Sequence, residues 1–504
     1  MTLEPRPDIP ALRLGLAQSV AHWGKYRAAE TALIVGTERL SYSDLDQLAT
    51  DVHGRVSAIA EPGARVGIVV DSKVSFVSTL IGVIRAGCTG VICPSSWSQE
   101  QLGQVIHDNT VRLLVLDVDR SELKCADGAP VGCIKVPLQY DASPTARTTC
   151  RRLATSDWAV LFSSGTTGRP KGIVRNDLSI LNELIGWCLE LSLGRTTQFY
   201  VGRPLFYTGG LVLAASTLLV GGCVISPTTH TPDLFVRLCG EHHPNYAFLL
   251  PSQIEELVAF AKGHAISPLN TTILSMGAFI EPDLKREAIA RLGCAFIESW
   301  GNSEGLGTIA WTDDSVTRTN SIGRPFLGDE LLITDEQGNA LPYGNNGRLS
   351  GRADSCLSYY QSRDDLNRCL IKGDLVISED VGYQDAQGYF YLVARVSDLV
   401  SRAGTTVNLR EIERHANRLE EVRTSCAVAL STASAITRII VAVELRPDSH
   451  IDCAKTKELL NAALPPSHFV DGVTVVAELC RNAAGKVNIE SVRASMEATW
   501  KGLA

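Results

Sequence analysis

Short apolar runs rich in β-branched residues alternate with longer stretches of helical apolar spacing up to about residue 320. Arg65–Val70 is such a run, Phe76–Ala86 has helical spacing, and Val91–Cys93 begins the next buried run. Strand, helix and strand at this spacing predict a βαβ unit. The pattern recurs from Trp158–Phe162, through a glycine-rich turn, to a helical stretch over Leu178–Leu191. Repetition of this alternation predicts doubly wound α/β layers.

Further short buried strands are expected where apolar runs lie between helical segments. These runs are Tyr246–Leu250, Ile273–Met276 and Ala295–Ile297. Near the start of the chain, Ser43 is the expected N-cap of a helix that runs through Leu45 and Leu48.

The pattern changes after about residue 320, where turn residues become dense. Asp335–Gly338 and Tyr343–Gly347 separate short runs such as Glu330–Thr334, which is typical of antiparallel hairpins. From about Ser397 a compact segment follows that mixes helical stretches, such as Glu411–Leu419, with short strands. We therefore predict a large α/β domain with a β-rich section over residues 1–394, and a small α+β domain over residues 395–504.

The composition is that of an ordinary globular protein, with 504 residues of which 45% are hydrophobic and 20% charged. A formal net charge of −8 gives no reason to expect a nucleic-acid partner. The longest apolar stretch, Leu211–Ile225, is shorter than the ~20 residues of a membrane span and is expected to form a buried core helix. Because Met1–Gly15 does not resemble a secretory signal, we expect a cytoplasmic protein with no membrane span.

The most informative segment is Ser163–Gly172, which reads Ser-Ser-Gly-Thr-Thr-Gly-Arg-Pro-Lys-Gly between an apolar strand and a helical stretch. Its glycines let backbone N–H groups face an anion, its hydroxyls add donors, and Lys171 adds a positive charge. A Walker A loop ends in Gly-Lys-Ser/Thr, and this segment does not. The segment therefore predicts a cradle for a polyphosphate that differs from a P-loop.

The same decapeptide resembles the phosphate loop of the adenylate-forming superfamily, which includes acyl-CoA synthetases, luciferases and the adenylation domains of peptide synthetases. Other segments resemble that family's motifs in the family's order: Leu80–Gly87, Pro204–Gly210, Trp300–Glu304, Ala394–Asp398 with Gly404 and Glu411–Glu413, and Arg481–Lys486. The resemblance implies the superfamily's fold and its reaction, in which ATP activates a carboxylic acid as an acyl-adenylate and pyrophosphate leaves.

The resemblance also implies roles for individual residues. Thr166, Thr167, Gly168 and Lys171 would hold the β- and γ-phosphates of ATP, with Thr167 and Glu304 also counted as catalytic. Glu304 would hold Mg²⁺, which bridges phosphate oxygens. Trp300 would lie against the adenine. The remaining residues of the implied nucleotide site are Ser163, Ser164, Gly165, Gly277, Gly301, Asn302 and Ser303.

Two aspartates compete for the position that accepts hydrogen bonds from the ribose hydroxyls. Asp374 lies in a Gly-Asp-Leu that resembles the family's Thr-Gly-Asp-Leu. Asp380, however, precedes Arg395 by 15 residues in a run that matches the family without a gap, whereas Asp374 precedes it by 21. We therefore assign the ribose to Asp380 with Arg395 beside it, and expect Asp374 to be a turn residue.

Lys486 matches the family's catalytic lysine, which the small C-terminal domain delivers to the carboxylate and the α-phosphate. The resemblance implies that this domain is mobile and turns about a hinge near residue 397. Ser397 stands where the family has an acid, and Ser401 stands where it has a lysine. These departures bear on the second half-reaction, the transfer of the acyl group to a thiol, more than on adenylation.

Tyr207 bears on the substrate. Amino-acid-activating relatives carry an aspartate at this position, which pairs with the α-ammonium, and a tyrosine cannot neutralise a buried cation. Tyr207, Gly209, Gly210 and Phe248 are the expected lining of a mostly apolar acid pocket with one hydroxyl. We therefore expect the pocket to exclude α-amino acids.

The sequence thus predicts an AMP-forming acid ligase that uses ATP and Mg²⁺ and transfers the acyl group to a thiol, with coenzyme A as the first choice. Transfer to the phosphopantetheine of a carrier protein, or directly to an amine, is an alternative that the sequence does not separate. A non-catalytic nucleotide-binding relative is a further alternative. Against it stand Lys171, Glu304, Asp380, Arg395 and Lys486, which are all present.

Overall fold

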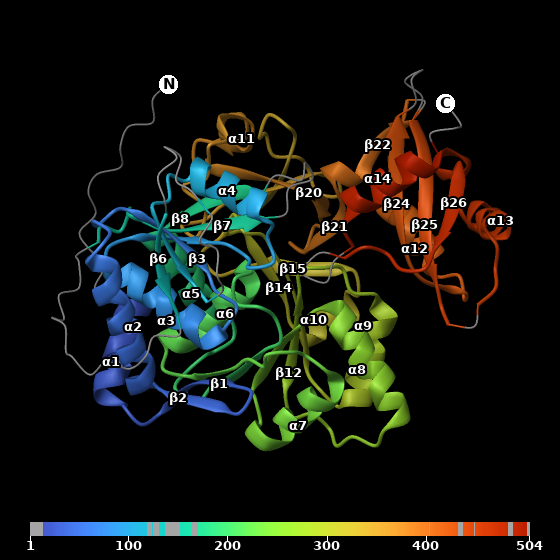
Figure 1. Ribbon diagram of the computed structural model, residues 1–504. Coiled ribbons are helices and arrows are strands. Elements are labelled where there is room, and N and C mark those ends of the chain that lie inside the picture. The colour runs from blue at the N-terminus through green and yellow to red at the C-terminus, as the bar shows by residue number, and fades with distance from the viewer. Residues whose placement is uncertain are drawn as a thin grey trace. The chain divides into compact units, whose positions relative to one another are not determined.

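The computed structural model describes residues 14–117, 123, 131–136, 152–163, 170–402, 404–431, 437–447, 449–481 and 487–500 (Figure 1). The described chain forms two compact units. The larger unit holds most of the chain up to Tyr391, and the smaller unit holds the chain from Leu392 onward together with Glu379–Gly382.

The first sheet of the larger unit has its strands in the order β18–β8–β7–β4–β3–β5–β6. In chain order these are β3 (Arg65–Val69), β4 (Thr89–Ile92), β5 (Leu113–Leu116), β6 (Gly132–Lys135), β7 (Asp157–Ser163), β8 (Lys171–Asn176) and β18 (Tyr359–Gln361). The strands from β7 to β6 are parallel, whereas β8 is antiparallel to both of its neighbours. Parallel strands joined by helices confirm the α/β class predicted from the alternation of apolar runs.

The second sheet has the order β16–β17–β20–β21–β15–β14–β13–β12–β11–β9–β10–β1–β2, with β19 paired to β20. Its strands are β1 (Thr31–Val35), β2 (Glu38–Ser41), β9 (Gln198–Val201), β10 (Cys223–Ile225), β11 (Tyr246–Leu249), β12 (Thr272–Met276), β13 (Phe296–Gly301), β14 (Gly307–Ala310), β15 (Ser321–Pro325), β16 (Glu330–Thr334), β17 (Gly347–Arg352), β19 (Ile371–Lys372), β20 (Leu375–Gln384) and β21 (Phe390–Arg395). The run from β13 to β1 is parallel, and the pairs β13–β14, β14–β15, β15–β21 and β16–β17 are antiparallel. The antiparallel part is the β-rich section expected after residue 320.

The helices of the larger unit are α1 (Leu16–Tyr26), α2 (Tyr42–Ser57), α3 (Lys73–Arg85), α4 (Gln99–Asp108), α5 (Asp177–Glu190), α6 (Thr208–Leu219), α7 (Pro232–His242), α8 (Pro251–Gly263), α9 (Pro282–Leu292), α10 (Thr312–Thr317) and α11 (Asp364–Leu370). One hydrophobic core contains residues of both sheets, such as Ile68 and Phe199, together with the buried faces of α2, α3, α5 and α6. The apolar stretch Leu211–Ile225 forms α6 and β10 within this core, so the core helix predicted there is confirmed except at its end, which is a strand.

The N-cap predicted for α2 was wrong by two residues. Ser41, not Ser43, caps the helix, and its side chain and that of Asp44 form a capping box. Tyr42 is the first helical residue and is fully buried, with its hydroxyl donating to the carbonyl of Gly222 at 2.7 Å. Both serines precede an acid by three residues, so this distant anchor, rather than the local pattern, sets where the helix starts.

The helical stretch predicted over Leu178–Leu191 is confirmed as α5, but the strand that precedes it was not predicted. Strand β8 lies between the glycine-rich segment and α5, which begins only at Asp177. Ser163 and Lys171 are paired across β7 and β8, so the segment that they enclose connects two antiparallel strands. The N-terminus of α5 therefore does not adjoin the predicted phosphate cradle, for which backbone N–H groups and Lys171 are the predicted means of binding an anion.

The smaller unit contains η1 (Val396–Asp398), β22 (Leu399–Arg402), β23 (Thr405–Asn408), α12 (Leu409–Ala416), β24 (Val422–Ser431), β25 (Thr437–Leu445), α13 (Cys453–Ala463), η2 (Pro466–His468), β26 (Gly472–Val476) and α14 (Ile489–Trp500). Strands β24, β25 and β26 form one sheet in that order. Alternate residues of β25 enter different cores: Val441 packs with α12 and α13, and Ile440 packs with α14. The period of two along the strand thus allows a single sheet to hold helices on both faces.

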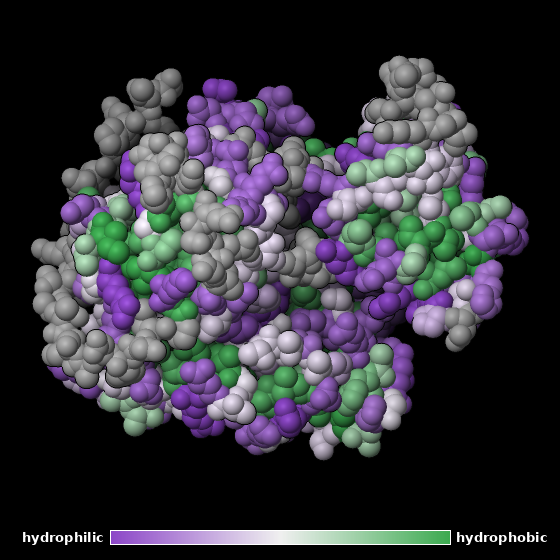
Figure 2. Space-filling view, in the orientation of Figure 1, coloured by the Kyte–Doolittle hydropathy of each residue, from purple (hydrophilic) through white to green (hydrophobic). Residues whose placement is uncertain are grey.

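Hydrophilic and hydrophobic residues are interspersed on the face of the molecule shown in Figure 2. Within the described chain, no helix has both the length and the apolar character needed to cross a membrane.

Candidate active site

The predicted phosphate loop is held by the hairpin of β7 and β8. Lys171 is the first residue of β8 and is only 4% exposed, although lysine is rarely buried. Ser163, its partner in the ladder, is the last residue of β7. Ser164, Gly165, Thr166, Thr167 and Gly168 lie outside the described residues, so their contacts with phosphate remain a prediction.

Glu304 lies in the turn between β13 and β14. The hydroxyl of Tyr360 donates to Oε1 of Glu304 at 3.0 Å, and the carbonyl of Glu304 accepts from the backbone N–H of Leu357 at 2.7 Å. Asn302 closes the turn, because its side-chain oxygen accepts from the N–H of Leu306 at 3.0 Å. The carboxylate is therefore held in a defined orientation on a short, bonded turn.

The residue after Glu304 has to be glycine. Gly305 has a φ of +98°, a conformation that side chains rarely adopt, and a Cβ there would lie 2.0 Å from the carbonyl oxygen of Ser355. Ser355 belongs to the segment that precedes β18, so the backbone of the Glu304 turn packs closely against that segment. The glycine of the family-like Trp300–Glu304 motif is Gly301, and the need for Gly305 became visible only in the structure.

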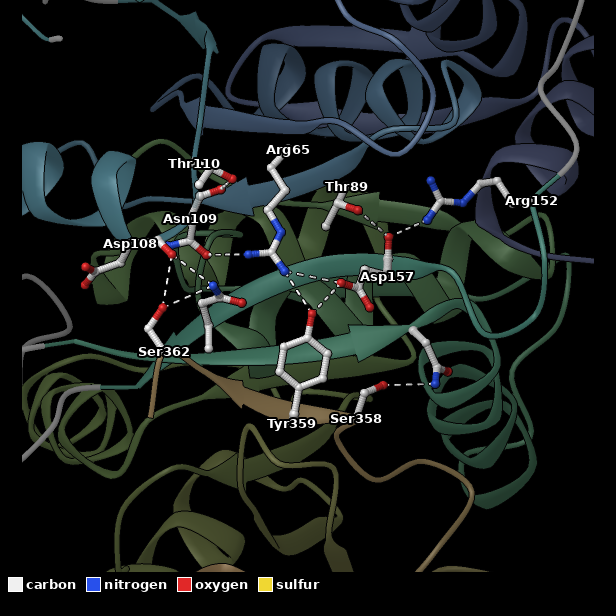
Figure 3. Close-up of polar contacts among 12 residues, drawn as sticks. Arg65, Thr89, Asp108, Asn109, Thr110, Arg152, Asp157, Ser358, Tyr359 and Ser362 are labelled. Carbon is white, nitrogen blue, oxygen red and sulfur yellow. Dashed lines mark hydrogen bonds and ion pairs between the residues drawn. The ribbon is translucent and has the colours of Figure 1, made fainter. Parts of the chain in front are cut away.

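Tyr360 reaches Glu304 because β18 joins the first sheet, although the other strands of that sheet come much earlier in the sequence. Figure 3 shows that Arg65, Asp157 and Tyr359 form a closed polar triangle. Arg65 donates to the Tyr359 hydroxyl at 2.9 Å, and that hydroxyl donates to Asp157 at 2.8 Å. Burial, with the neighbouring Asp157 carboxylate, raises the pKa of Tyr359 to about 12. The hydroxyl thus keeps its proton, and the triangle fixes β18 beside β8.

Two of the family-like motifs touch each other in the larger unit. The hydroxyls of Thr208 and Ser303 lie 2.9 Å apart and share a hydrogen bond. Arg175, which is fully buried and paired with Glu183 at 2.8 Å, donates to the carbonyl of Ser303 at 3.3 Å. Since Arg175 belongs to β8, its hydrogen bond connects the strand that follows the predicted phosphate loop to the turn that carries Glu304.

The residues predicted to contact the acid surround a buried arginine that sequence reasoning missed. The guanidinium carbon of Arg203 lies 4.8 Å from the ring centre of Tyr207 and 6.0 Å from that of Phe248. Arg203 is 7% exposed, and a Cβ on Gly277 would lie 3.3 Å from its Nη1. The residues predicted as a mostly apolar lining with one hydroxyl therefore have a positive charge beside them. The sequence signal that could have indicated it is a single arginine at the end of the apolar stretch before Pro204.

The two glycines at the start of α6 allow close packing. A Cβ on Gly209 would lie 2.7 Å from Cε of Met276 and 3.4 Å from the Phe248 ring, and a Cβ on Gly210 would lie 2.9 Å from the carbonyl of Pro204. Tyr207 precedes them as the N-cap residue of α6. Burial raises the pKa of the Tyr207 hydroxyl, and the positive charge of Arg203 acts in the opposite direction.

Trp300 lies in β13 and is 8% exposed. Its neighbour Gly301 ends the strand, and a Cβ on Gly301 would meet the sulfur of Met276 at 3.6 Å. Met276 therefore lies between the predicted adenine-binding motif and Gly209, a residue of the predicted acid site. The contact of Trp300 with adenine remains a prediction.

The two candidate ribose-binding aspartates differ sharply in their surroundings. Asp380 is 4% exposed and accepts a hydrogen bond from Nε of Arg395 at 3.0 Å. The side chain of Asp374 is 73% exposed, and it lies in the turn between β19 and β20 beside Arg352. The structure thus brings together the pair Asp380 and Arg395 named from sequence spacing, and it confirms that Asp374 is a turn residue.

Lys486 lies outside the described residues. The residues that flank its loop, Arg481 and Val487, form an antiparallel bridge in the smaller unit. Ser397, the predicted hinge, lies in η1. The buried Asp398 that follows it accepts from Nε of Arg410 at 2.9 Å, which fixes the end of this turn to α12 of the same unit.

Comparisons with known proteins identify the class. The model of the AMP-binding enzyme family matches residues 20–360. A sulfoacetate–CoA ligase of Cupriavidus necator is 27% identical over 332 residues, which cover 65% of this chain and 65% of that protein. A feruloyl-CoA synthase of Amycolatopsis is 24% identical over 407 residues, which cover 79% of this chain and 82% of that protein.

Solved structures show the same fold. The ATP-bound MatB of Rhodopseudomonas palustris has a TM-score of 0.84 at 22% identity, covering 96% of this chain and 99% of that one. The amide bond synthetase McbA of Marinactinospora thermotolerans has a TM-score of 0.79 at 20% identity, covering 95% and 99%.

The chain belongs to the family of AMP-binding enzymes. The resemblance predicted from its motifs is confirmed, and with it the reaction class, an AMP-forming acid ligase.

Proposed function

We propose that this enzyme activates a carboxylic acid without an α-ammonium group as its acyl-adenylate and transfers the acyl group to coenzyme A. One observation carries the proposal. The strand after the predicted phosphate loop, the Glu304 turn and the acid-site motif are joined by the bonds of Arg175 and Thr208 to Ser303. Residues predicted to hold phosphates, metal and acid therefore belong to one connected arrangement.

In adenylation a carboxylate attacks the α-phosphate, so two anions meet and negative charge must be neutralised. We assign Lys171 to the phosphates beyond the reacting one. We assign Lys486 to the carboxylate and the α-phosphate, where its charge opposes their repulsion. Asp380 accepts hydrogen bonds from the ribose hydroxyls and so positions the nucleotide for attack.

Glu304 is suited to Mg²⁺, which is bound in such sites by one or two carboxylates together with substrate phosphates. Its carboxylate is half-buried and oriented by the Tyr360 hydroxyl. When bound, the metal would neutralise phosphate charge.

Coenzyme A is our proposed acceptor because the curated relatives named above are ligases or synthases of coenzyme A esters. A carrier-protein phosphopantetheine and an amine are the competing acceptors. The likeness to an amide bond synthetase is the reason to test an amine. The test is ATP–pyrophosphate exchange with a panel of acids, followed by product analysis with coenzyme A, a phosphopantetheinylated carrier and simple amines. Exchange with an α-amino acid in preference to its des-amino analogue would contradict the proposed acid class.

Asp380→Ala should raise the KM for ATP by about tenfold to a hundredfold, as expected when a charged acceptor of hydrogen bonds is lost. Asp374→Ala should change the KM by less than about twofold, because Asp374 is an exposed turn residue. The measurement is exchange at varied ATP concentration. If Asp374→Ala raised the KM more than Asp380→Ala, our assignment of the ribose to Asp380 would be wrong.

We further propose that the smaller unit turns about Ser397 between the two half-reactions. Ser397→Pro should abolish product formation while acyl-adenylate accumulates, because proline fixes φ near −65°. Ser397→Ala is the matched control and should retain both steps. Quenched-flow detection of adenylate and thioester measures the two half-reactions separately. Unchanged thioester formation in the proline variant would exclude a hinge at this residue.

A further inference from the structure

Arg203 is a buried cation that has no carboxylate beside it among the described residues. The described part of the chain contains three buried arginines, Arg85, Arg175 and Arg203. Arg85 is paired with Asp46 at 2.6 Å, and Arg175 is paired with Glu183 at 2.8 Å. In the same part of the chain, Arg203 forms no ion pair and donates no hydrogen bond. Buried charges in proteins are normally paired, so the partner of Arg203 is to be sought outside these residues.

The surroundings of Arg203 place it within the predicted acid site. Its guanidinium lies over the rings of Tyr207 and Phe248, and the backbone of Gly277 borders Nη1. The Tyr207 hydroxyl also has no hydrogen-bond partner among the described residues. Two side chains with donor groups therefore meet beside the residues assigned to the acyl group.

We propose that Arg203 binds a second anionic group, a carboxylate, of the acid that this enzyme activates. The inference rests on the proposed function, because it concerns the acyl group of the same substrate. A guanidinium offers two parallel N–H donors that match a carboxylate. The hydroxyl of Tyr207, whose ring lies against the guanidinium, is a third donor.

The aromatic rings alone do not account for the burial of Arg203. A cation gains attraction from a ring face, but the guanidinium N–H groups point along the plane of the group and still need acceptors. A substrate carboxylate would supply both the acceptors and the opposite charge. An α-ammonium in this region would instead be repelled, which agrees with the predicted exclusion of α-amino acids.

The test uses ATP–pyrophosphate exchange with matched pairs of acids. Malonate, succinate, glutarate, phthalate, isophthalate and terephthalate are each compared with their monoamide, which has a similar shape but one negative charge. For at least one pair, the wild-type enzyme should prefer the diacid in kcat/KM by about 10²-fold, as for a buried charge pair that loses one partner. Preference for the monoamide in all pairs would overturn the inference.

Three variants separate recognition from structure. Arg203→Gln should lower kcat/KM for the diacid much more than for the monoamide and so lose the preference for the diacid, whereas Arg203→Lys should restore part of the preference. Arg237→Gln, at an exposed arginine of α7 whose side chain is 65% exposed, is the control and should behave as wild type. Thermal unfolding of each variant shows whether the fold is retained.

The outcomes distinguish this inference from the proposed function. Equal loss of exchange with both members of each pair in a folded Arg203→Gln variant would mean that Arg203 only supports the fold of the site. Exchange with monoacids but not with diacids would leave the proposed function standing and overturn the inference. Absence of exchange with every acid in the wild type would overturn the proposed function itself, and the inference with it.

Discussion

Replacement of Lys486 by alanine is expected to lower ATP–pyrophosphate exchange by about 10²–10³-fold, the usual cost of removing one pre-placed charge from a transition state. The carboxylate and the α-phosphate are both anionic, and this lysine is the cation that the motif Arg481–Lys486 assigns to them. The fold should be spared, because Arg481 and Val487 close the loop through their backbones.

The matched control is Lys455→Ala in α13 of the same unit. Lys455 is exposed and is paired with Glu458 on the same helix, so its loss should leave exchange within about twofold of wild type. Thermal unfolding of both variants checks that they fold. Near-normal exchange by a folded Lys486→Ala enzyme would remove Lys486 from the catalytic assignment.

Glu304→Gln should lower exchange by about 10²-fold and raise the Mg²⁺ concentration needed for half-maximal activity. Glutamine keeps the size of the side chain and its ability to accept from Tyr360, but it removes the negative charge that a hard cation requires. The measurement is exchange at varied Mg²⁺ and saturating ATP. An unaltered Mg²⁺ dependence would exclude Glu304 as a ligand.

Tyr360→Phe should have a smaller effect of the same kind. It removes the hydroxyl that orients Glu304 and leaves the carboxylate in place, so the loss should be about tenfold and should again appear in the Mg²⁺ dependence. A larger effect than that of Glu304→Gln would mean that Tyr360 acts on the reaction by a route other than this hydrogen bond.

The sequence determined the class of the fold and named most of the residues that are assigned to the candidate site. Parallel strands and helices follow from local apolar periodicity, which depends on neighbouring residues only. The motifs could be placed for the same reason, since Trp300–Glu304 and the spacing of Asp380 to Arg395 are local features of the chain. Asp380 in particular was separated from Asp374 by counting residues, and the structure brings it to Arg395.

Tertiary structure decided the features that join distant segments. The start of α2 at Tyr42 depends on a hydrogen bond to Gly222, and the orientation of Glu304 depends on Tyr360, which β18 brings in from 56 residues away. Local sequence patterns contain no information on such contacts. The burial of Arg203, with no ion pair among the described residues, is another such feature, because the sequence does not show whether an arginine is buried or exposed. Only the surrounding fold shows which carboxylates each arginine reaches, and Arg203 reaches none among the described residues.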